Sequence, residues 1–195
     1  MSTSIYSIGH GRKEISEFLT ELQSFGIEYL LDVRSSPYSK WSPQFNQEAL
    51  RIILTDAGIK YAYFGDSIGG RPTDPSCYDE NGFFDYARMA QVPAFKAGLQ
   101  RLVTANQQGN RLALMCSESD PSECHRSKLI GRELYVNYNI DMLHIIAPSK
   151  AITETTVVEQ LTKHSWVPNL IFGEPMPTFK SRKSYINSNT EEDYD

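Results

Sequence analysis

The sequence has no apolar run of about 18 residues, the length that a membrane-spanning helix needs. Its first residues carry too little hydrophobicity before Gly9-His10-Gly11 to act as a signal peptide. Cysteine is scarce, and an odd count of three is not typical of a disulfide scaffold. These absences predict a cytoplasmic protein with no membrane partner.

A strong charge of one sign is also lacking. The chain has 19 Lys and Arg against 24 Asp and Glu, a net charge of −5, but four of the acidic residues lie among the last five. Without those four the balance is 19 against 20, so the body is nearly neutral. The basic excess of a non-specific nucleic-acid-binding protein is missing, although a local basic site remains compatible with this balance. We expect residues 186–195 to form a disordered acidic tail.

Two glycine-rich nucleotide motifs are missing as well. The sequence contains neither a dinucleotide-binding fingerprint nor a Walker sequence. This disfavours a Rossmann dehydrogenase and a P-loop NTPase.

What is present is an alternation of short apolar runs with helical periodicity. It predicts a single α/β domain over residues 1–165, with a mostly parallel open sheet of about five strands flanked by helices. Turn residues dominate a loop-rich insertion at about 66–92, and prolines favour an extended C-terminal arm over 166–185. We expect strands at 5–8, 29–33, 59–64, 111–116 and 141–146, and helices at 14–25, 47–57, 93–105, 127–138 and 152–163.

Polar side chains gather where these predicted strands end. In open α/β sheets, ligands bind in the crevice at the carboxyl ends of the strands. The loops that follow four of the strands contain His10, Arg34, residues 65–71 and residues 116–126. The sequence therefore predicts a functional site at this edge.

Residues 116–126 are the densest of these segments. Asp120-Pro121-x-Glu123 is similar to a capping box, which predicts that Cys124, His125 and Arg126 occupy the first turn of a helix. Free amides and the positive end of the helix dipole would favour a thiolate at Cys124 and an anionic ligand nearby. The alternative is a Cys124 packed as a small hydrophobe, with Arg126 paired to a surface carboxylate.

Several chemistries could use this segment. A nucleophilic thiol needs a base within reach, which His125 or His10 could supply. Neither Cys116 nor Cys124 meets the C-x5-R pattern of a phosphatase loop. Cys116, Cys124, His125 and His10 offer metal-ligand atoms, but C-x7-C is not a usual zinc spacing, so we predict no metal site and assign no cofactor.

Other candidates are weaker singly. Arg34 could bind an anion or form a structural salt bridge with Asp32. Gly69-Gly70-Arg71 resembles a backbone nest for an oxyanion, although glycine pairs more often make turns. His144 and His164 are interpreted as structural. Six aromatic residues could stack on a base or belong to the core: Tyr38, Trp41, Phe45, Tyr61, Tyr63 and Phe64.

At these positions the chain resembles the domain of unknown function 488 family, over about Ile5 to Leu161. The specific stretch is C-x-E-x-x-P-x-x-C-H-R at 116–126, supported by SIGHG at 7–11, DVRSSPYS at 32–39, the helix start at 45–50 and IGG at 68–70. The residue after His10 is Gly, where many members have Ser or Thr, and the arm after 165 lies outside the resemblance. The resemblance implies a site at His10, Arg34, Gly70, Cys116, Glu118, Cys124, His125 and Arg126, without implying an activity.

The leading hypothesis is an enzyme of hydrolase or transferase type that acts on a small anionic or nucleotide-like substrate, including a nucleic-acid end or base. Cys116 or Cys124 would be the nucleophile or redox centre, with Glu118, His125 or His10 as acid or base. Arg34, Gly70, Arg71 and Arg126 would hold the anion. One alternative is a non-catalytic module that binds nucleic acid or protein, and another is a dithiol redox protein. The arm could also join two copies in a homodimer.

Overall fold

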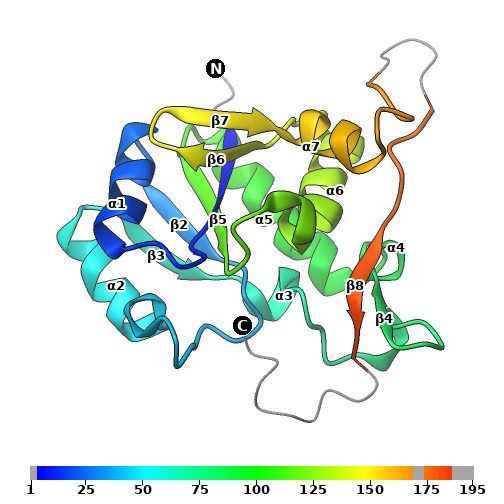
Figure 1. The fold of residues 1–195 in the computed structure, drawn as a ribbon, viewed down its shortest axis with the longest axis horizontal. Coiled ribbons are helices and arrows are strands. Elements are labelled where there is room, and N and C mark those ends of the chain that lie inside the picture. The colour runs from blue at the N-terminus through cyan, green and yellow to red at the C-terminus, as the bar shows by residue number, and fades with distance from the viewer. Residues whose placement is uncertain (1–3, 169–173, 186–195) are drawn as a thin grey trace.

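A computed structural model describes residues 4–168 and 174–185. Its core is a six-stranded sheet with the order β3-β2-β5-β1-β6-β7, in which only β7 runs antiparallel to its neighbour. The predicted α/β fold with a mostly parallel sheet is confirmed (Figure 1). The predicted acidic tail, residues 186–195, lies outside the described residues. The strands are β1 (Ile5–Gly9), β2 (Tyr29–Asp32), β3 (Lys60–Tyr63), β5 (Leu112–Cys116), β6 (Leu143–Ala147) and β7 (Lys150–Thr153).

Strand β7 is the sixth strand, which the sequence analysis missed. The prediction of a helix from residue 152 was wrong at its start, because α7 covers only Glu154–Leu161. Ser149 has a φ of 56°, which turns the chain back after β6 and forms a hairpin. The side chain of Thr153 caps α7 by accepting a hydrogen bond from the amide of Thr156, and this fixes the helix start.

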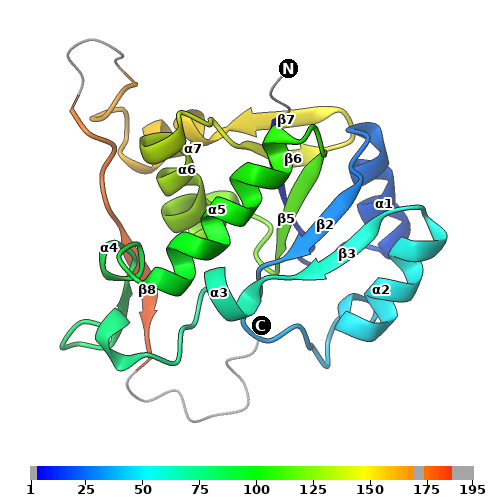
Figure 2. The ribbon, with the colours of Figure 1, turned by 180° about the vertical axis from the view of Figure 1, so that it is seen from behind.

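Helices cover both faces of the sheet. Helices α1 (Ile15–Ser24) and α2 (Gln47–Asp56) lie on one side, and α5 (Pro93–Gln107) and α6 (Arg132–Tyr138) lie on the other (Figures 1 and 2). Strand β5 is buried along its whole length and alternates between two hydrophobic clusters. Leu114 and Cys116 belong to the cluster on the α5 side, because side chains alternate along a strand. The last residue of β5 therefore meets the segment that leads into α6.

The predicted insertion and the predicted arm lie side by side. The insertion contains α3 (Gly65–Ile68), β4 (Phe83–Asp85) and α4 (Tyr86–Met89). Strand β8 (Lys180–Ser184) of the arm pairs antiparallel with β4 to form a second, two-stranded sheet (Figure 1). Within the described residues, no helix combines the length and the hydrophobicity that crossing a bilayer requires.

Candidate active site

A groove with a volume of about 1270 Å³ lies at the carboxyl ends of the central strands. Its inner wall includes Arg34 after β2, Cys116 at the end of β5, and His125. Its outer wall comes from the insertion and the arm. Among the site residues that the sequence predicted, six line the groove: Arg34, Gly70, Arg71, Cys116, Glu118 and His125.

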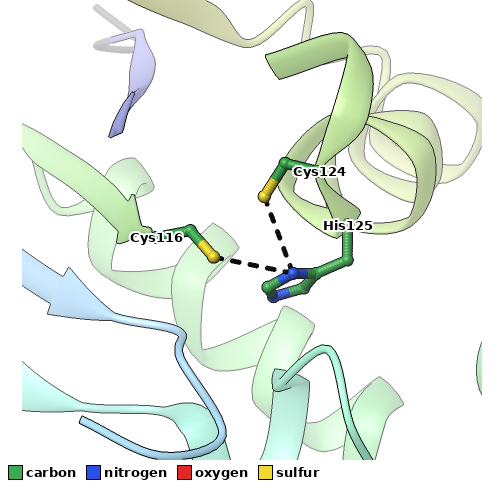
Figure 3. A group of neighbouring side chains, drawn as sticks. All are labelled: Cys116, Cys124 and His125. Atoms are coloured by element: carbon green, nitrogen blue, oxygen red, sulfur yellow. Dashed lines mark hydrogen bonds between the residues drawn. The ribbon is translucent and has the colours of Figure 1, made fainter. Parts of the chain in front are cut away.

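The thiols of Cys116 and Cys124 meet at the imidazole of His125 (Figure 3). The Nδ1 atom of His125 lies 3.9 Å from the sulfur of Cys116 and 3.7 Å from the sulfur of Cys124. The other ring nitrogen, Nε2, lies 3.1 Å from the carbonyl oxygen of Val33 and donates to it, because a carbonyl can only accept. Nδ1 is thereby directed at both sulfur atoms.

Glycine at position 70 makes room for this ring. A Cβ atom built on Gly70 would lie 2.7 Å from Nδ1 of His125, closer than real Cβ contacts. Gly9 plays a similar part at the end of β1, where a Cβ atom would lie 1.9 Å from the carbonyl oxygen of Glu118. Both glycines are therefore required by the close approach of their neighbours.

The segment before α6 differs from the predicted helix start. Asp120 does act as a cap, but for a short 3-10 turn over Pro121–Glu123, where it accepts from the amide of Ser122. Glu123 forms an ion pair with Arg182 of β8 instead of reaching back to the cap. Cys124 is extended, with φ −115° and ψ 148°, so the prediction that it lies in the first helical turn was wrong.

A π-helical turn follows, over Arg126–Gly131, and leads directly into α6. Such turns are rare and occur frequently at functional sites. The turn is buried along its whole length. Its first amide, that of Arg126, donates to the sulfur of Cys124 at 3.4 Å, so one predicted interaction between the helix start and this thiol is present.

Arg126 is the most unusual residue of the site, since it is a guanidinium only 1% exposed. It donates from Nε to the sulfur of Cys124 at 3.3 Å, from one NH group to Ser7 Oγ and from the other to the carbonyl oxygen of Glu118. No carboxylate forms an ion pair with it among the described residues. The alternative in which Arg126 pairs with a surface carboxylate was therefore wrong.

A buried cation without a counterion is costly, so the sulfur of Cys124 is the anion that Arg126 requires. Burial opposes ionisation, but the hydrogen bond from the Cys116 thiol and the charges of Arg126 and His125 hold the pKa of Cys124 well below its ordinary value. Burial alone would lower the pKa of His125, yet the negative charge of Cys124 raises it. The two side chains therefore stabilise each other as a thiolate and an imidazolium.

Cys116 is the thiol on the groove side of the pair. Its single hydrogen has two acceptors, the sulfur of Cys124 and Oε2 of Glu118, which lies 2.9 Å from the Cys116 sulfur. The hydrogen bond to Cys124 and burial raise the pKa of Cys116, so its proton stays in place while Cys124 is ionised. Burial and the charge of Cys124 raise the pKa of Glu118.

Arg34 follows the structural alternative that the sequence left open. It forms two hydrogen bonds with the carboxylate of Asp32, from Nε at 2.9 Å and from an NH group at 2.6 Å. A third bond reaches the carbonyl oxygen of Phe45 at 2.8 Å. Arg34 is nevertheless among the residues that line the groove, so its charge acts on that space although its position is fixed.

His10 is held behind Arg34 and is not among the residues that line the groove. Its ring stacks on Phe45 with centroids 4.4 Å apart, and its Nε2 lies 3.4 Å from an NH group of Arg34. Nδ1 donates to the carbonyl oxygen of Gly11, so Nε2 is the acceptor. Burial and the charge of Arg34 lower the pKa of His10 to about 4. These contacts fit a residue that orients Arg34.

Cys116, Cys124 and His125 could also hold a metal ion, since their ligand atoms lie within 4.8 Å of one another. In a tetrahedral zinc site, a sulfur and a nitrogen ligand lie about 3.6 Å apart. The two measured separations, 3.7 and 3.9 Å, are close to that value. The C-x7-C spacing predicted no metal here, and His10, the fourth candidate ligand, is not part of this group.

Several groove residues were not found from the sequence. The outer wall contributes aromatic rings and cations, whereas none of the six aromatic residues singled out in the sequence lines the groove. Phe45 packs on His10 and Tyr61 bonds to Asp32, while Tyr38 and Trp41 are exposed. The sequence did not predict these outer-wall residues, because the arm and the insertion are far apart in the sequence and meet only through the pairing of β8 with β4. The residues missed on this wall include Tyr78, Tyr86, Arg182, Lys183 and Tyr185.

The fold and the site together define an α/β domain with a buried cluster of thiols, imidazole and guanidinium at the edge of its sheet. The chain belongs to the family described as Domain of unknown function DUF488, whose model matches residues 14–132, more than half of the sequence. The predicted resemblance is thereby confirmed over a shorter range, which excludes His10 and includes residues 116–126. No curated protein and no solved structure matched the chain.

Proposed function

We propose that the chain is a cysteine-dependent enzyme, of hydrolase or transferase type, for a small anionic or nucleotide-like substrate. One observation carries the proposal. The Cys116 thiol borders the groove and donates to Glu118 at 2.9 Å, beside a Cys124 sulfur that the buried Arg126 holds as an anion. Three free cysteines fit a reducing compartment such as the cytoplasm.

In the proposed step, the sulfur of Cys116 attacks an electrophilic atom of the substrate and forms a covalent bond to it. Glu118 takes the thiol proton and passes it to the leaving group, which departs with the electrons of the broken bond. The pKa of Glu118 is raised towards pH 7, and a general base is most effective when its pKa lies near the pH of the reaction. Water or a second substrate then displaces the sulfur and regenerates the thiol.

Cys124, His125 and Arg126 have supporting roles in this proposal. The Cys124 thiolate lies behind Cys116 and raises the basicity of Glu118 through its charge. His125 borders the groove as a proton donor to the reacting group, because its pKa is raised. Arg126 lies outside the set of groove-lining residues, so it fixes Cys124 rather than the substrate.

The groove supports an anionic substrate with a flat ring. Arg34, Arg71 and Lys183 border it, and their positive charges would attract a phosphate or carboxylate. Tyr78, Tyr86 and Tyr185 also line it and could stack on a base. The end of a nucleic-acid strand carries the same two groups, a phosphate and a base, and belongs to the same class of substrate. The expected homodimer through the arm stays a prediction.

The first experiment measures the reactivity of the three thiols in the metal-free protein, by mass spectrometry after limited alkylation over a range of pH. We expect Cys116 to be labelled first, because Cys77 is buried against Met89 and does not border the groove. Glu118→Gln should slow the labelling of Cys116 while Cys77 is unaffected. Labelling of Cys116 no faster than that of Cys77 would contradict the proposal.

The substrate class is tested separately, by thermal shift with nucleotides, short oligonucleotides and inorganic phosphate. We expect stabilisation by at least one anionic compound, weakened by Arg71→Gln. No shift with any of them would reject the nucleotide-like substrate. The binding-module alternative predicts instead that Cys116→Ser retains a bound ligand and that no compound in the panel is turned over.

A dithiol redox function is the second candidate, because the ligand atoms of Cys116, Cys124 and His125 all lie within 4.8 Å. A disulfide requires its two sulfur atoms to approach to about 2.05 Å. Mild oxidation followed by a thiol count decides this candidate. A loss of two thiols, reversed by a dithiol reductant, supports it, and an unchanged count excludes it.

A further inference from the structure

Four fully buried polar side chains continue the hydrogen bonding of Arg126. They are Ser7, His144, Glu154 and Ser127, the last of which follows Arg126 in the sequence. An NH group of Arg126 lies 3.2 Å from Ser7 Oγ, and Ser7 Oγ lies 2.6 Å from Nδ1 of His144. Nε2 of His144 lies 2.7 Å from one carboxylate oxygen of Glu154. The other carboxylate oxygen lies 2.9 Å from Ser127 Oγ. Apart from Arg126, at 1%, every member has an exposed fraction of 0%.

The direction of each hydrogen bond follows from chemistry. A guanidinium only donates, so Ser7 accepts from Arg126 and directs its own hydrogen to Nδ1 of His144. A carboxylate only accepts, so Nε2 of His144 and the hydroxyl of Ser127 both donate to Glu154. Each of these hydrogen bonds then joins one donor to one acceptor. Together they connect the buried cation of Arg126 to the buried carboxylate of Glu154 through Ser7 and His144.

This series of hydrogen bonds begins and ends on the π-helical turn. Arg126 and Ser127 are consecutive residues of that turn, and both are connected to the same carboxylate, one directly and one through Ser7 and His144. Gly131, at the end of the turn, permits this contact, because a Cβ atom there would lie 2.4 Å from Glu154. Glu154 therefore lies against the turn that carries the site.

We propose that Ser7, His144 and Glu154 are positioning residues that hold Arg126 against the sulfur of Cys124. The proposal rests on the proposed function, in which that sulfur is an anion. Ordinary core packing does not call for this arrangement, since apolar side chains of similar size would fill the space without buried hydrogen bonds. Ser7, His144 and Glu154 all lie outside the segment that matches the family model, residues 14–132.

The decisive variants are Ser7→Ala, which removes only the hydroxyl, and Glu154→Gln, which keeps the shape of the side chain. The control is Glu21→Gln. Glu21 of α1 is also a buried carboxylate, but it lies on the other face of the sheet and pairs with Lys13, just before that helix. A general loss of a buried carboxylate would affect Glu21→Gln and Glu154→Gln alike, whereas a positioning role affects only Glu154→Gln.

The measurement is the pH titration of each cysteine by NMR of ¹³C-labelled Cβ atoms, in metal-free protein, which needs no access of a reagent to the buried sulfur. We expect the ratio of thiolate to thiol at Cys124, compared at one pH within its titration, to fall about three- to tenfold in Ser7→Ala and Glu154→Gln. Glu21→Gln should titrate like the parent. Resonances of Cys77 report whether each variant is folded. Unchanged titration of Cys124 in a folded Ser7→Ala would overturn the proposal.

A measurement on the unmodified protein covers the case in which the variants do not fold. The ¹⁵N shifts of the His144 ring distinguish the two tautomers, and the proposal requires the proton on Nε2 and an acceptor at Nδ1. Slow solvent exchange of the Arg126 side-chain hydrogens is expected with it. The opposite tautomer contradicts the proposal, whether or not Cys116 is reactive, so its failure is distinguishable from failure of the proposed function.

Discussion

Two buried arginines lie at the edge of the same sheet, and they differ in their anions. Arg34 has a carboxylate partner, Asp32, which it contacts with two hydrogen bonds. Arg126 has a sulfur atom, Cys124, and only neutral acceptors besides. Both guanidinium groups are nearly inaccessible, so solvent can replace neither anion.

The two anions differ in their reactivity, and this difference indicates different tasks for the two ion pairs. A carboxylate is neither oxidised nor readily alkylated, and two hydrogen bonds join it to the guanidinium, so the pair of Arg34 and Asp32 is fixed. A thiolate can be alkylated, oxidised or protonated, so the pair of Arg126 and Cys124 responds to reagents and to pH. The site thus combines one fixed and one reactive ion pair within the same edge.

The largest expected effect comes from breaking the fixed pair. Asp32→Asn leaves Arg34 buried without an anion and should lower the free energy of unfolding by about 3–5 kcal/mol. Urea denaturation measures it. The control is Glu48→Gln, which removes an exposed ion pair with Arg51 and should cost less than about 1 kcal/mol. A loss below 1 kcal/mol in Asp32→Asn would show that Arg34 does not depend on its carboxylate.

The support behind Arg34 should be sensitive to acid. Because the pKa of His10 falls from 6.5 to about 4 on folding, its contribution is present above pH 6.5 and is lost as the pH falls towards 4. This amounts to about 3 kcal/mol. His10→Gln should remove that part of the pH dependence in urea unfolding, while His164→Gln, at an exposed position, should retain it. Equal slopes for all three proteins would be the contrary result.

The stability that the reactive pair contributes should also depend on pH, in the same direction and over the titration range of Cys124. The depressed pKa of Cys124 contributes stability that is fully present above the ordinary thiol value and is lost as the pH falls through the folded pKa. Cys124→Ser should therefore destabilise the protein more at pH 9 than at pH 6. At pH 9 we expect the free energy of unfolding, measured with urea, to fall by about 2 kcal/mol. Cys77→Ser is the matched control, because burial raises the pKa of Cys77 and its cost should not grow over this range.

The smallest effect belongs to the exposed pair of Arg182 and Glu123, which connects β8 to the segment before Cys124. Arg182→Gln should lower the free energy of unfolding by about 0.5 kcal/mol, because both side chains are largely solvated. Added salt should reduce the difference further. A loss of several kcal/mol would mean that the arm depends on this ion pair rather than on its backbone bonds to β4.

The sequence predicts the sheet edge well because that inference needs only the order of strands. Arg34, Cys116 and His125 could be placed together, since each follows or leads from an apolar run that must be buried. The path between Asp120 and Arg126 could not be predicted, because a 3-10 turn and a π-helical turn differ from a capped helix by small changes in hydrogen bonding. Ser7, His144 and Glu154 carry no local signal, since each becomes meaningful only through partners more than ten positions away or on another element.

The pairing of β4 with β8 makes the groove a composite of two distant parts of the chain. The thiols and the imidazole on its inner wall come from residues up to 126, whereas its outer wall also needs residues 181–185. Separation of β8 from β4 would therefore open the groove on its outer side without removing Cys116, Cys124 or His125. The reactive cluster and the enclosure around it are thus two separable parts of one site.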